Sequence, residues 1–175
     1  MRSGLFFRPT PRPLAPALHL SYTWLMSNAC TDNRLGALLG RLRAQGLRLT
    51  PQRVAIVREL VRRDDHPSVE QLHKAILADF PTTSLATVYK TIHLLKEQGE
   101  VLELGFGELG SRYDGRRPEP HPHLICTRCG AITDPPCQGG ELDELVARLA
   151  GQTGFAVNAH RFDLFGLCPA CRGAS

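Results

Sequence analysis

The sequence predicts an α+β protein with a helical N-terminal domain over residues 31–114 and a small, metal-stapled α+β domain over residues 115–175. Three observations carry this prediction. Stretches with helical periodicity and capping residues follow one another from residue 34 to residue 99. A glycine-rich hairpin comes next, and two C-x-x-C pairs occupy the C-terminal third of the chain.

Residues 1–30 are expected to form a disordered extension. Their apolar stretches are interrupted by Pro9, Pro11, Pro13 and Pro16, and a segment that cannot bury a continuous apolar face stays disordered. The same prolines would break the apolar core of a signal peptide. An alternative interpretation is that translation starts at Met26.

Four helices are expected in the N-terminal domain. The first has apolar residues at i, i+3, i+4 and i+7, starting from Leu35. The other three begin at side chains that favour helix N-termini, namely Thr50, Ser68 and Ser84. Pro81 ends the third helix, because proline cannot continue a helix.

A β-hairpin is expected after the fourth helix, because residues 101–104 and 111–114 flank a turn rich in glycine. Short helices followed by a hairpin favour a winged helix-turn-helix, in which the fourth helix enters the major groove of DNA. Its outward residues Thr87, Tyr89 and Lys90 would then contact DNA, and Arg53 of the second helix would contact phosphate. The alternative is an ordinary solvated helix face, with Arg53 covering its own helix.

The cysteine spacing predicts a zinc site. Cys126 and Cys129 form one C-x-x-C pair, and Cys168 and Cys171 form another. Two such pairs close a tetrahedral all-thiolate site with no open position, which suits a structural ion. Disulfides are the alternative, but the chain shows no secretion signal, so we expect the reducing cytoplasm.

His121 and His123 predict a second, exchangeable metal site beside the zinc. In a strand, residues i and i+2 point to the same face, so both imidazoles can reach one ion. Around them we expect strands near residues 124–125, 131–132 and 155–167 and a helix over residues 141–152. Such a small unit leaves a sheet edge that a second copy of the chain would cover, giving a homodimer.

Composition excludes a membrane protein. The chain has a net charge of +4, and no apolar run approaches the roughly 20 residues that a membrane span needs. The N-terminal domain is mildly basic, since residues 34–103 hold eleven Lys and Arg against eight Asp and Glu. A basic surface there would favour an anionic partner such as DNA.

These motifs occur together in one order, over residues 46–53, 66–68, 84–90, 112–114, 121–130 and 166–171. Together they make residues 34–172 resemble the ferric uptake regulator family of bacterial metal-dependent repressors. The resemblance implies a winged-helix DNA-binding domain, a dimerisation domain, and a homodimer on an inverted-repeat DNA operator. It implies neither an enzyme nor a small-molecule substrate.

The resemblance also implies the ligands of the metal sites. Structural Zn(2+) falls on the four cysteines, and regulatory Fe(2+) or Mn(2+) falls on His66, Asp114, His121, His123 and Asp134. Many members of the family have a further site, which here would use two residues.

Glu141 and His160 match two ligands of that further site. They are weak candidates, because Pro120 and Pro122 stand where its other two ligands are expected.

The regulatory signal has more than one interpretation. An aspartate at Asp114 resembles the peroxide-responsive branch, in which bound Fe(2+) reacts with hydrogen peroxide and ligand histidines matching His66 and His121 are oxidised. The zinc-responsive branch brings a cysteine to the regulatory site, for which Cys137 is the free candidate. From a different class, a hydrolase would use the same His and Asp ligands to activate water.

Overall fold

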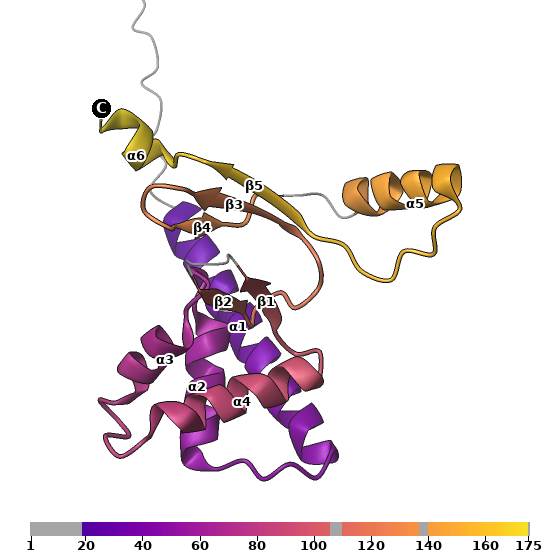
Figure 1. Ribbon diagram of the computed structural model, residues 1–175. Coiled ribbons are helices and arrows are strands. Elements are labelled where there is room, and N and C mark those ends of the chain that lie inside the picture. The colour runs from indigo at the N-terminus through magenta and orange to yellow at the C-terminus, as the bar shows by residue number, and fades with distance from the viewer. Residues whose placement is uncertain (1–18, 106–109, 137–139, 175) are drawn as a thin grey trace, which may run out of the picture.

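The computed structural model describes residues 19–105, 110–136 and 140–174, with side chains from residue 31 onward (Figure 1). The described N-terminal part contains α1 (His19–Ala44), α2 (Pro51–Arg62), α3 (Val69–Ile76) and α4 (Leu85–Glu97). The antiparallel hairpin of β1 (Leu102–Gly105) and β2 (Ser111–Asp114) follows α4. This order of helices and hairpin is the predicted winged helix-turn-helix.

The predicted capping residues begin their helices. The Thr50 hydroxyl accepts a hydrogen bond from the backbone N–H of Arg53, and Pro51 follows it at the first position of α2. Ser68 and Gln71 form the reciprocal pair of a capping box at α3. The Ser84 side chain caps α4 in the same way. Each cap satisfies an N–H that the helix leaves unpaired, which contributes about 1 kcal/mol.

Helix α1 is longer than predicted. It begins at His19, so residues 19–30, expected to be disordered, are helical. The prolines that suggested disorder end at Pro16, and no further proline occurs before Pro51, so nothing in that interval prevents a helix. Residues 1–18 lie outside the described part of the chain. In the parts that are described, no helix is both long and apolar enough to cross a bilayer.

The C-terminal domain is a three-stranded sheet with a helical crossover. Strands β3 (Pro122–Cys126), β4 (Ile132–Thr133) and β5 (Phe162–Gly166) lie in the order β4-β3-β5, with β3 and β5 parallel. Helix α5 (Glu141–Thr153) connects β4 to β5, and the short α6 (Pro169–Gly173) ends the domain. The strand predicted from residue 155 begins only at Phe162, because only residues 162–166 pair with β3.

A buried cluster of apolar side chains holds α1 to α4 together, with Leu38, Leu42, Ile56, Leu60, Leu72, Ile92 and Leu95 at its centre. A smaller cluster joins the two domains, since Leu104 of the hairpin packs with Ile125 and Ile132 of the C-terminal sheet. The hairpin therefore contacts both the helices and the sheet.

An ionic network fixes the junction that follows the hairpin. Arg34 and Arg41 of α1 both bind the carboxylate of Glu100, which is only 7% exposed. The Arg34 guanidinium also donates to the carbonyl oxygen of Gly115, at 3.3 Å. Gly115 lies directly after β2, so α1 holds the start of the connection between the two domains.

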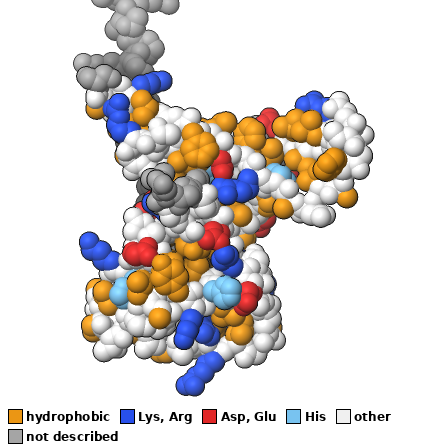
Figure 2. Space-filling view, in the orientation of Figure 1, with side chains coloured by type: hydrophobic (Ala, Val, Ile, Leu, Met, Phe, Trp, Pro, Cys, Tyr) orange, Lys and Arg blue, Asp and Glu red, His pale blue; other side chains and the backbone are white. Residues whose placement is uncertain are grey.

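Helix α5 stands away from the sheet in Figure 1, and none of its residues is buried. Figure 2 shows hydrophobic side chains gathered on this projecting lobe. Large apolar side chains are also exposed along β5 and beside it, including Phe162, Leu164, Phe165 and Leu167. The C-terminal domain thus leaves many large apolar side chains exposed, whereas the N-terminal domain buries most of its own between the helices.

Candidate metal centres

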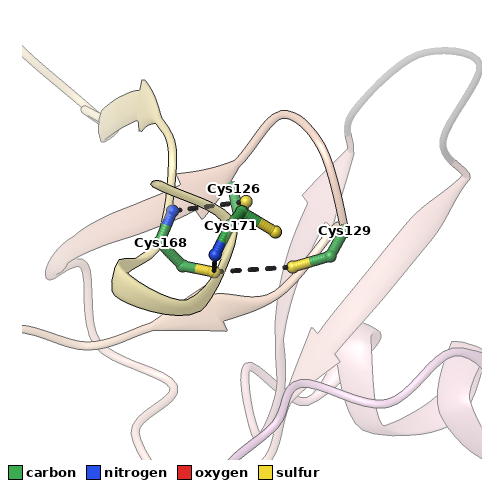
Figure 3. A group of neighbouring side chains, drawn as sticks. All are labelled: Cys126, Cys129, Cys168 and Cys171. Atoms are coloured by element: carbon green, nitrogen blue, oxygen red, sulfur yellow. Dashed lines mark hydrogen bonds between the residues drawn. The ribbon is translucent and has the colours of Figure 1, made fainter. Parts of the chain in front are cut away.

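The four cysteines of the C-x-x-C pairs meet at one end of the sheet (Figure 3). Cys126 ends β3, Cys129 lies in the turn after it, Cys168 caps α6 and Cys171 lies within α6. All four are free thiols whose sulfur atoms lie within 4.8 Å of one another.

The spacing of the sulfur atoms fits a tetrahedral ion. Cys129 Sγ and Cys168 Sγ are 3.8 Å apart, and Zn–S bonds of about 2.3 Å at tetrahedral angles place sulfur atoms about 3.8 Å apart. The backbone N–H of Cys168 donates to Cys126 Sγ at 3.3 Å. That hydrogen bond and others from the turn lower the pKa of Cys126 to about 6, favouring the thiolate that binds metal.

A second cluster lies between the two domains. His66 comes from the loop between α2 and α3, Asp114 ends β2, and His121 and His123 come from the start of the C-terminal sheet. The four are buried, and their nearest ligand atoms lie within 4.8 Å of one another. Asp134, which follows β4, joins them: its Oδ1 is 3.0 Å from His66 Nε2, and its Oδ2 is 3.4 Å from His121 Nε2.

The ligand atoms of this cluster face one another closely, with the ring nitrogens of His66 and His121 at 3.0–3.6 Å from the carboxylates of Asp114 and Asp134. The atoms His66 Nε2, Asp114 Oδ2, His121 Nε2, His123 Nε2 and Asp134 Oδ1 are buried, and none makes a hydrogen bond within the described structure. A buried polar atom without a partner costs about 1–3 kcal/mol. The four residues whose atoms lie within 4.8 Å of one another, with Asp134 beside them, fit a divalent cation with nitrogen and oxygen ligands.

Two of the candidate ligands are held by hydrogen bonds on the side that faces away from the cluster. Asp114 Oδ1 accepts from the backbone N–H groups of Arg116 at 2.7 Å and Arg117 at 3.0 Å, which leaves Oδ2 for the ion. His121 Nδ1 donates to the Glu119 carbonyl oxygen at 2.8 Å, which turns Nε2 toward the cluster, where it can bind a cation once its proton is displaced.

His66 is held in a backbone conformation that side chains rarely adopt. Its φ is 51°, the one positive value among the described residues other than glycine. The Arg112 guanidinium donates to the carbonyl oxygens of both His66 and Asp65 and so braces this loop against the hairpin. A strained conformation persists only where surrounding contacts fix it, and such strain concentrates at functional sites.

Charge also concentrates in this cluster. Burial opposes protonation of His66 and His121, but the carboxylates of Asp114 and Asp134 outweigh it and raise the pKa of His66 to about 9 and of His121 to about 10. Burial also opposes ionisation of the two aspartates, yet the same contacts hold their pKa values well below the usual range. Burial and the two neighbouring imidazoles lower the pKa of His123. A bound cation would therefore displace protons from the cluster.

The weak candidates for a further metal site stay apart from both clusters. In the described structure, Glu141 is exposed at the start of α5 and belongs to neither group of potential ligands. His160 belongs to neither group as well, although its Nε2 is buried without a hydrogen-bond partner. Cys137, the candidate for zinc sensing, lies outside the described residues.

Three of the four residues expected to contact DNA lie on α4, and the fourth, Arg53, lies in α2. Tyr89 is 48% exposed and its hydroxyl donates to Glu70 of α3 at 2.8 Å. Lys90 is exposed and Thr87 is half-buried in the first turn. Arg53 is half-buried as a residue, and its guanidinium donates to the Arg48 carbonyl oxygen, so it braces the loop before α2.

Sequence reasoning missed the residues that hold the ligands in place. The Arg112 guanidinium reaches carbonyl oxygens far away in the sequence, and Glu119 acts through its backbone carbonyl, so no local pattern indicates either contact. Asp163 in β5 did leave a signal, because it is a charged residue within the apolar strand FDLFG. Its distance from His123 is 3.5 Å between Oδ1 and Nδ1.

Comparison with known proteins gives one consistent result. Residues 44–165 match the ferric uptake regulator family. The peroxide-responsive repressor PerR of Staphylococcus aureus is 36% identical over 141 residues, which cover 81% of this chain and 93% of that repressor. The Campylobacter jejuni peroxide stress regulator superposes with a TM-score of 0.62 at 35% identity, covering 77% of this chain and 98% of that one. A zinc uptake regulator solved with zinc and DNA superposes with a TM-score of 0.60 at 28% identity, covering 82% and 96%.

Proposed function

The chain belongs to the ferric uptake regulator family, and from this premise we propose that it is a metal-dependent transcriptional repressor that binds operator DNA as a homodimer. The observation that carries the proposal is the cluster of His66, Asp114, His121, His123 and Asp134 between the two domains, whose buried nitrogen and oxygen atoms lie close together without hydrogen bonds. Structural zinc at the four cysteines would hold the C-terminal domain, and Fe(2+) or Mn(2+) at the second cluster would be the signal.

The ligand positions support a switch that acts on the orientation of the domains. His66 belongs to the helical domain, Asp114 ends its hairpin, and His121, His123 and Asp134 belong to the C-terminal domain. A cation shared by these residues favours one arrangement of the two domains. If that arrangement fits the operator, metal and DNA each strengthen the binding of the other by the same factor.

DNA binding is supported by the exposed face of α4. Tyr89 and Lys90 are exposed on the helix that a winged helix-turn-helix places in the major groove. The zinc uptake regulator with a similar fold was solved bound to DNA. We propose that Thr87, Tyr89 and Lys90 contact the operator. We also propose that Arg53 fixes the loop before α2 and contacts a DNA phosphate.

A homodimer is supported by the uncovered surface of the C-terminal domain. Strand β5 lies at the edge of its sheet, and apolar side chains along it are exposed. Helix α5 likewise has no buried residue. A second copy of the same chain would pair or cover these surfaces by two-fold symmetry. We place the dimer in the cytoplasm, where free thiols can bind zinc.

The donor set supports Fe(2+) or Mn(2+) as the regulatory ion, because it contains nitrogen and oxygen atoms and no thiolate. Peroxide sensing is supported by Asp114 and by similarity to two peroxide-responsive regulators. Zinc sensing is the second candidate, favoured by the DNA-bound zinc regulator of similar fold. We propose no catalytic activity.

The test is a set of DNA-binding titrations on purified, zinc-replete protein. Fe(2+), Mn(2+) and Zn(2+) are added in turn, each with and without hydrogen peroxide, to the His123→Ala variant and the unaltered chain. We expect metal to increase affinity for operator DNA only where His123 is present. In the Fe(2+) arm, peroxide should add about 16 Da, one oxygen atom, to His66 or His121 by mass spectrometry. Equal DNA binding after removal of the exchangeable ion would refute the proposal.

A further inference from the structure

Asp163 lies beside the proposed regulatory site without belonging to its ligands. It is the register partner of His123 across the parallel strands β3 and β5. Its neighbours in the strand, Phe162 and Leu164, are apolar and partly exposed, whereas the side chain of Asp163 is only 13% exposed. A charged side chain turned inward from an apolar strand needs a partner there.

The partner that the geometry offers is the ring nitrogen of His123 that faces away from the other ligands. Asp163 Oδ1 lies 3.5 Å from His123 Nδ1, and both atoms are buried and make no hydrogen bond. His123 Nε2, on the opposite side of the ring, faces Asp134 at 3.9 Å. The imidazole therefore separates Asp163 from the metal position, and Asp163 cannot be a ligand of the same ion.

The state of His123 depends on this contact. An imidazole that binds a metal through Nε2 carries its proton on Nδ1, and that proton is normally donated to a carboxylate or a carbonyl. His121 meets this need through the Glu119 carbonyl oxygen. For His123, Asp163 is the acceptor in reach, and a small rotation of the ring closes the 3.5 Å gap to hydrogen-bond length.

Asp163 is itself oriented by the next contact outward. Its second oxygen, Oδ2, accepts a hydrogen bond from the Arg161 guanidinium. Another nitrogen of the same guanidinium donates to the carbonyl oxygen of Gly105, at the end of β1. Arg161 therefore directs Oδ1 toward His123 and joins this side of the site to the hairpin of the helical domain.

We propose that Asp163 is the positioning residue of the regulatory site: it accepts the Nδ1 proton of His123 and so presents Nε2 to the metal. This inference rests on the proposed function of the cluster. Asp163 fixes both the tautomer and the ring orientation of a ligand, and outer partners of this kind change metal affinity by about 10–100-fold when removed.

The test is a Mn(2+) titration of full-length, zinc-replete protein carrying Asp163→Ala or Asp163→Asn. Asp79→Ala is the matched control, because Asp79 is an exposed aspartate of the helical domain, away from both clusters. We expect Asp163→Ala to weaken Mn(2+) binding by about 10–100-fold. Asp163→Asn should weaken it less, because its amide oxygen still accepts the proton. The zinc content of both variants should stay that of the unaltered chain.

A spectroscopic readout separates positioning from a general effect on folding. In Co(2+)-loaded protein, the exchangeable Nδ1 protons of histidine ligands give strongly shifted proton resonances. The resonance of His123, assigned by its loss in His123→Ala, should exchange with water faster in Asp163→Ala than in the unaltered chain.

Mn(2+) affinity in Asp163→Ala within twofold of the unaltered chain would overturn the inference and leave the proposed function standing. Loss of zinc or of thermal stability in both Asp163 variants, with Mn(2+) affinity falling equally in the two, would also overturn it in favour of a structural role. If the unaltered chain binds Mn(2+) no better than His123→Ala does, the proposed function fails and the inference fails with it.

Discussion

Replacing Gly115 with alanine should destabilise the protein and weaken metal binding together. Gly115 directly follows Asp114, which we propose as a metal ligand, and packs against α2. An added Cβ would lie 2.6 Å from Leu60 Cγ and 2.9 Å from Leu60 Cδ2. Carbon atoms pack at about 3.5–4.0 Å, so the connection or the leucine must move by about 1 Å. Leu60 is fully buried and cannot yield freely, so part of the movement falls on Asp114.

The size of the effect follows from the cost of overpacking a core, which is about 1–3 kcal/mol. In a chain of this length each kcal/mol lowers the melting temperature by about 2–4 °C. Gly36→Ala is the control of opposite sign. Gly36 lies in α1, and a Cβ there meets nothing within 4 Å. Alanine in place of glycine within a helix stabilises by roughly 0.5–1 kcal/mol.

The assay is thermal unfolding of both variants by circular dichroism, with a Mn(2+) titration alongside. We expect Gly115→Ala to melt lower and bind Mn(2+) more weakly, and Gly36→Ala to melt slightly higher with unchanged Mn(2+) binding. A Gly115→Ala protein as stable as the unaltered chain would show that the contact with Leu60 is not tight. A less stable one that binds Mn(2+) normally would refute the link from the junction to Asp114.

Three further results are expected. Cys129→Ser should release zinc and weaken the dimer, and a variant that keeps its zinc and sediments as a stable dimer would contradict the four-thiolate site. The double variant Tyr89→Ala, Lys90→Ala should lose operator binding in gel-shift titrations while keeping its melting temperature; retained binding would remove α4 from the DNA interface. Glu100→Gln should cost about 1–3 kcal/mol, because it weakens the charged hydrogen bonds to two arginines, one of which is half exposed. The hydrogen bond from Arg41 lowers the pKa of Glu100 from 4.5. The cost of the substitution should therefore be present above pH 4.5 and shrink on acidification. Urea unfolding at several pH values measures this cost, and a cost independent of pH would contradict the ionic network.

Local signals were sufficient to predict the helices of the N-terminal domain. Thr50, Ser68 and Ser84 act on backbone groups within three residues, so the sequence contains both partners of each cap. The predicted start of α1 was wrong, by contrast. Disorder was expected up to residue 30, but the helix begins at His19, soon after the last proline of the N-terminal segment. The hairpin was predicted from its glycine-rich turn and is confirmed.

Long-range pairings were beyond local reasoning. The spacing of His121 and His123 suggested one metal, but the approach of His66 and Asp114 to them depends on how two domains pack. Those residues came from the family resemblance and not from periodicity. The position of Asp163 opposite His123 depends on the register of a parallel pair closed through α5, which no short motif encodes.

The isolation of α5 has a consequence for measurement. A helix of 13 residues is marginal in water when nothing packs against it, since isolated helices become stable only beyond about 12–15 residues. Its amide hydrogens should therefore exchange quickly with deuterium in dilute protein and slow down as concentration rises and a second chain covers it. Deuterium uptake in α5 would then report the association constant of the protein directly, in the absence of DNA and of any added metal.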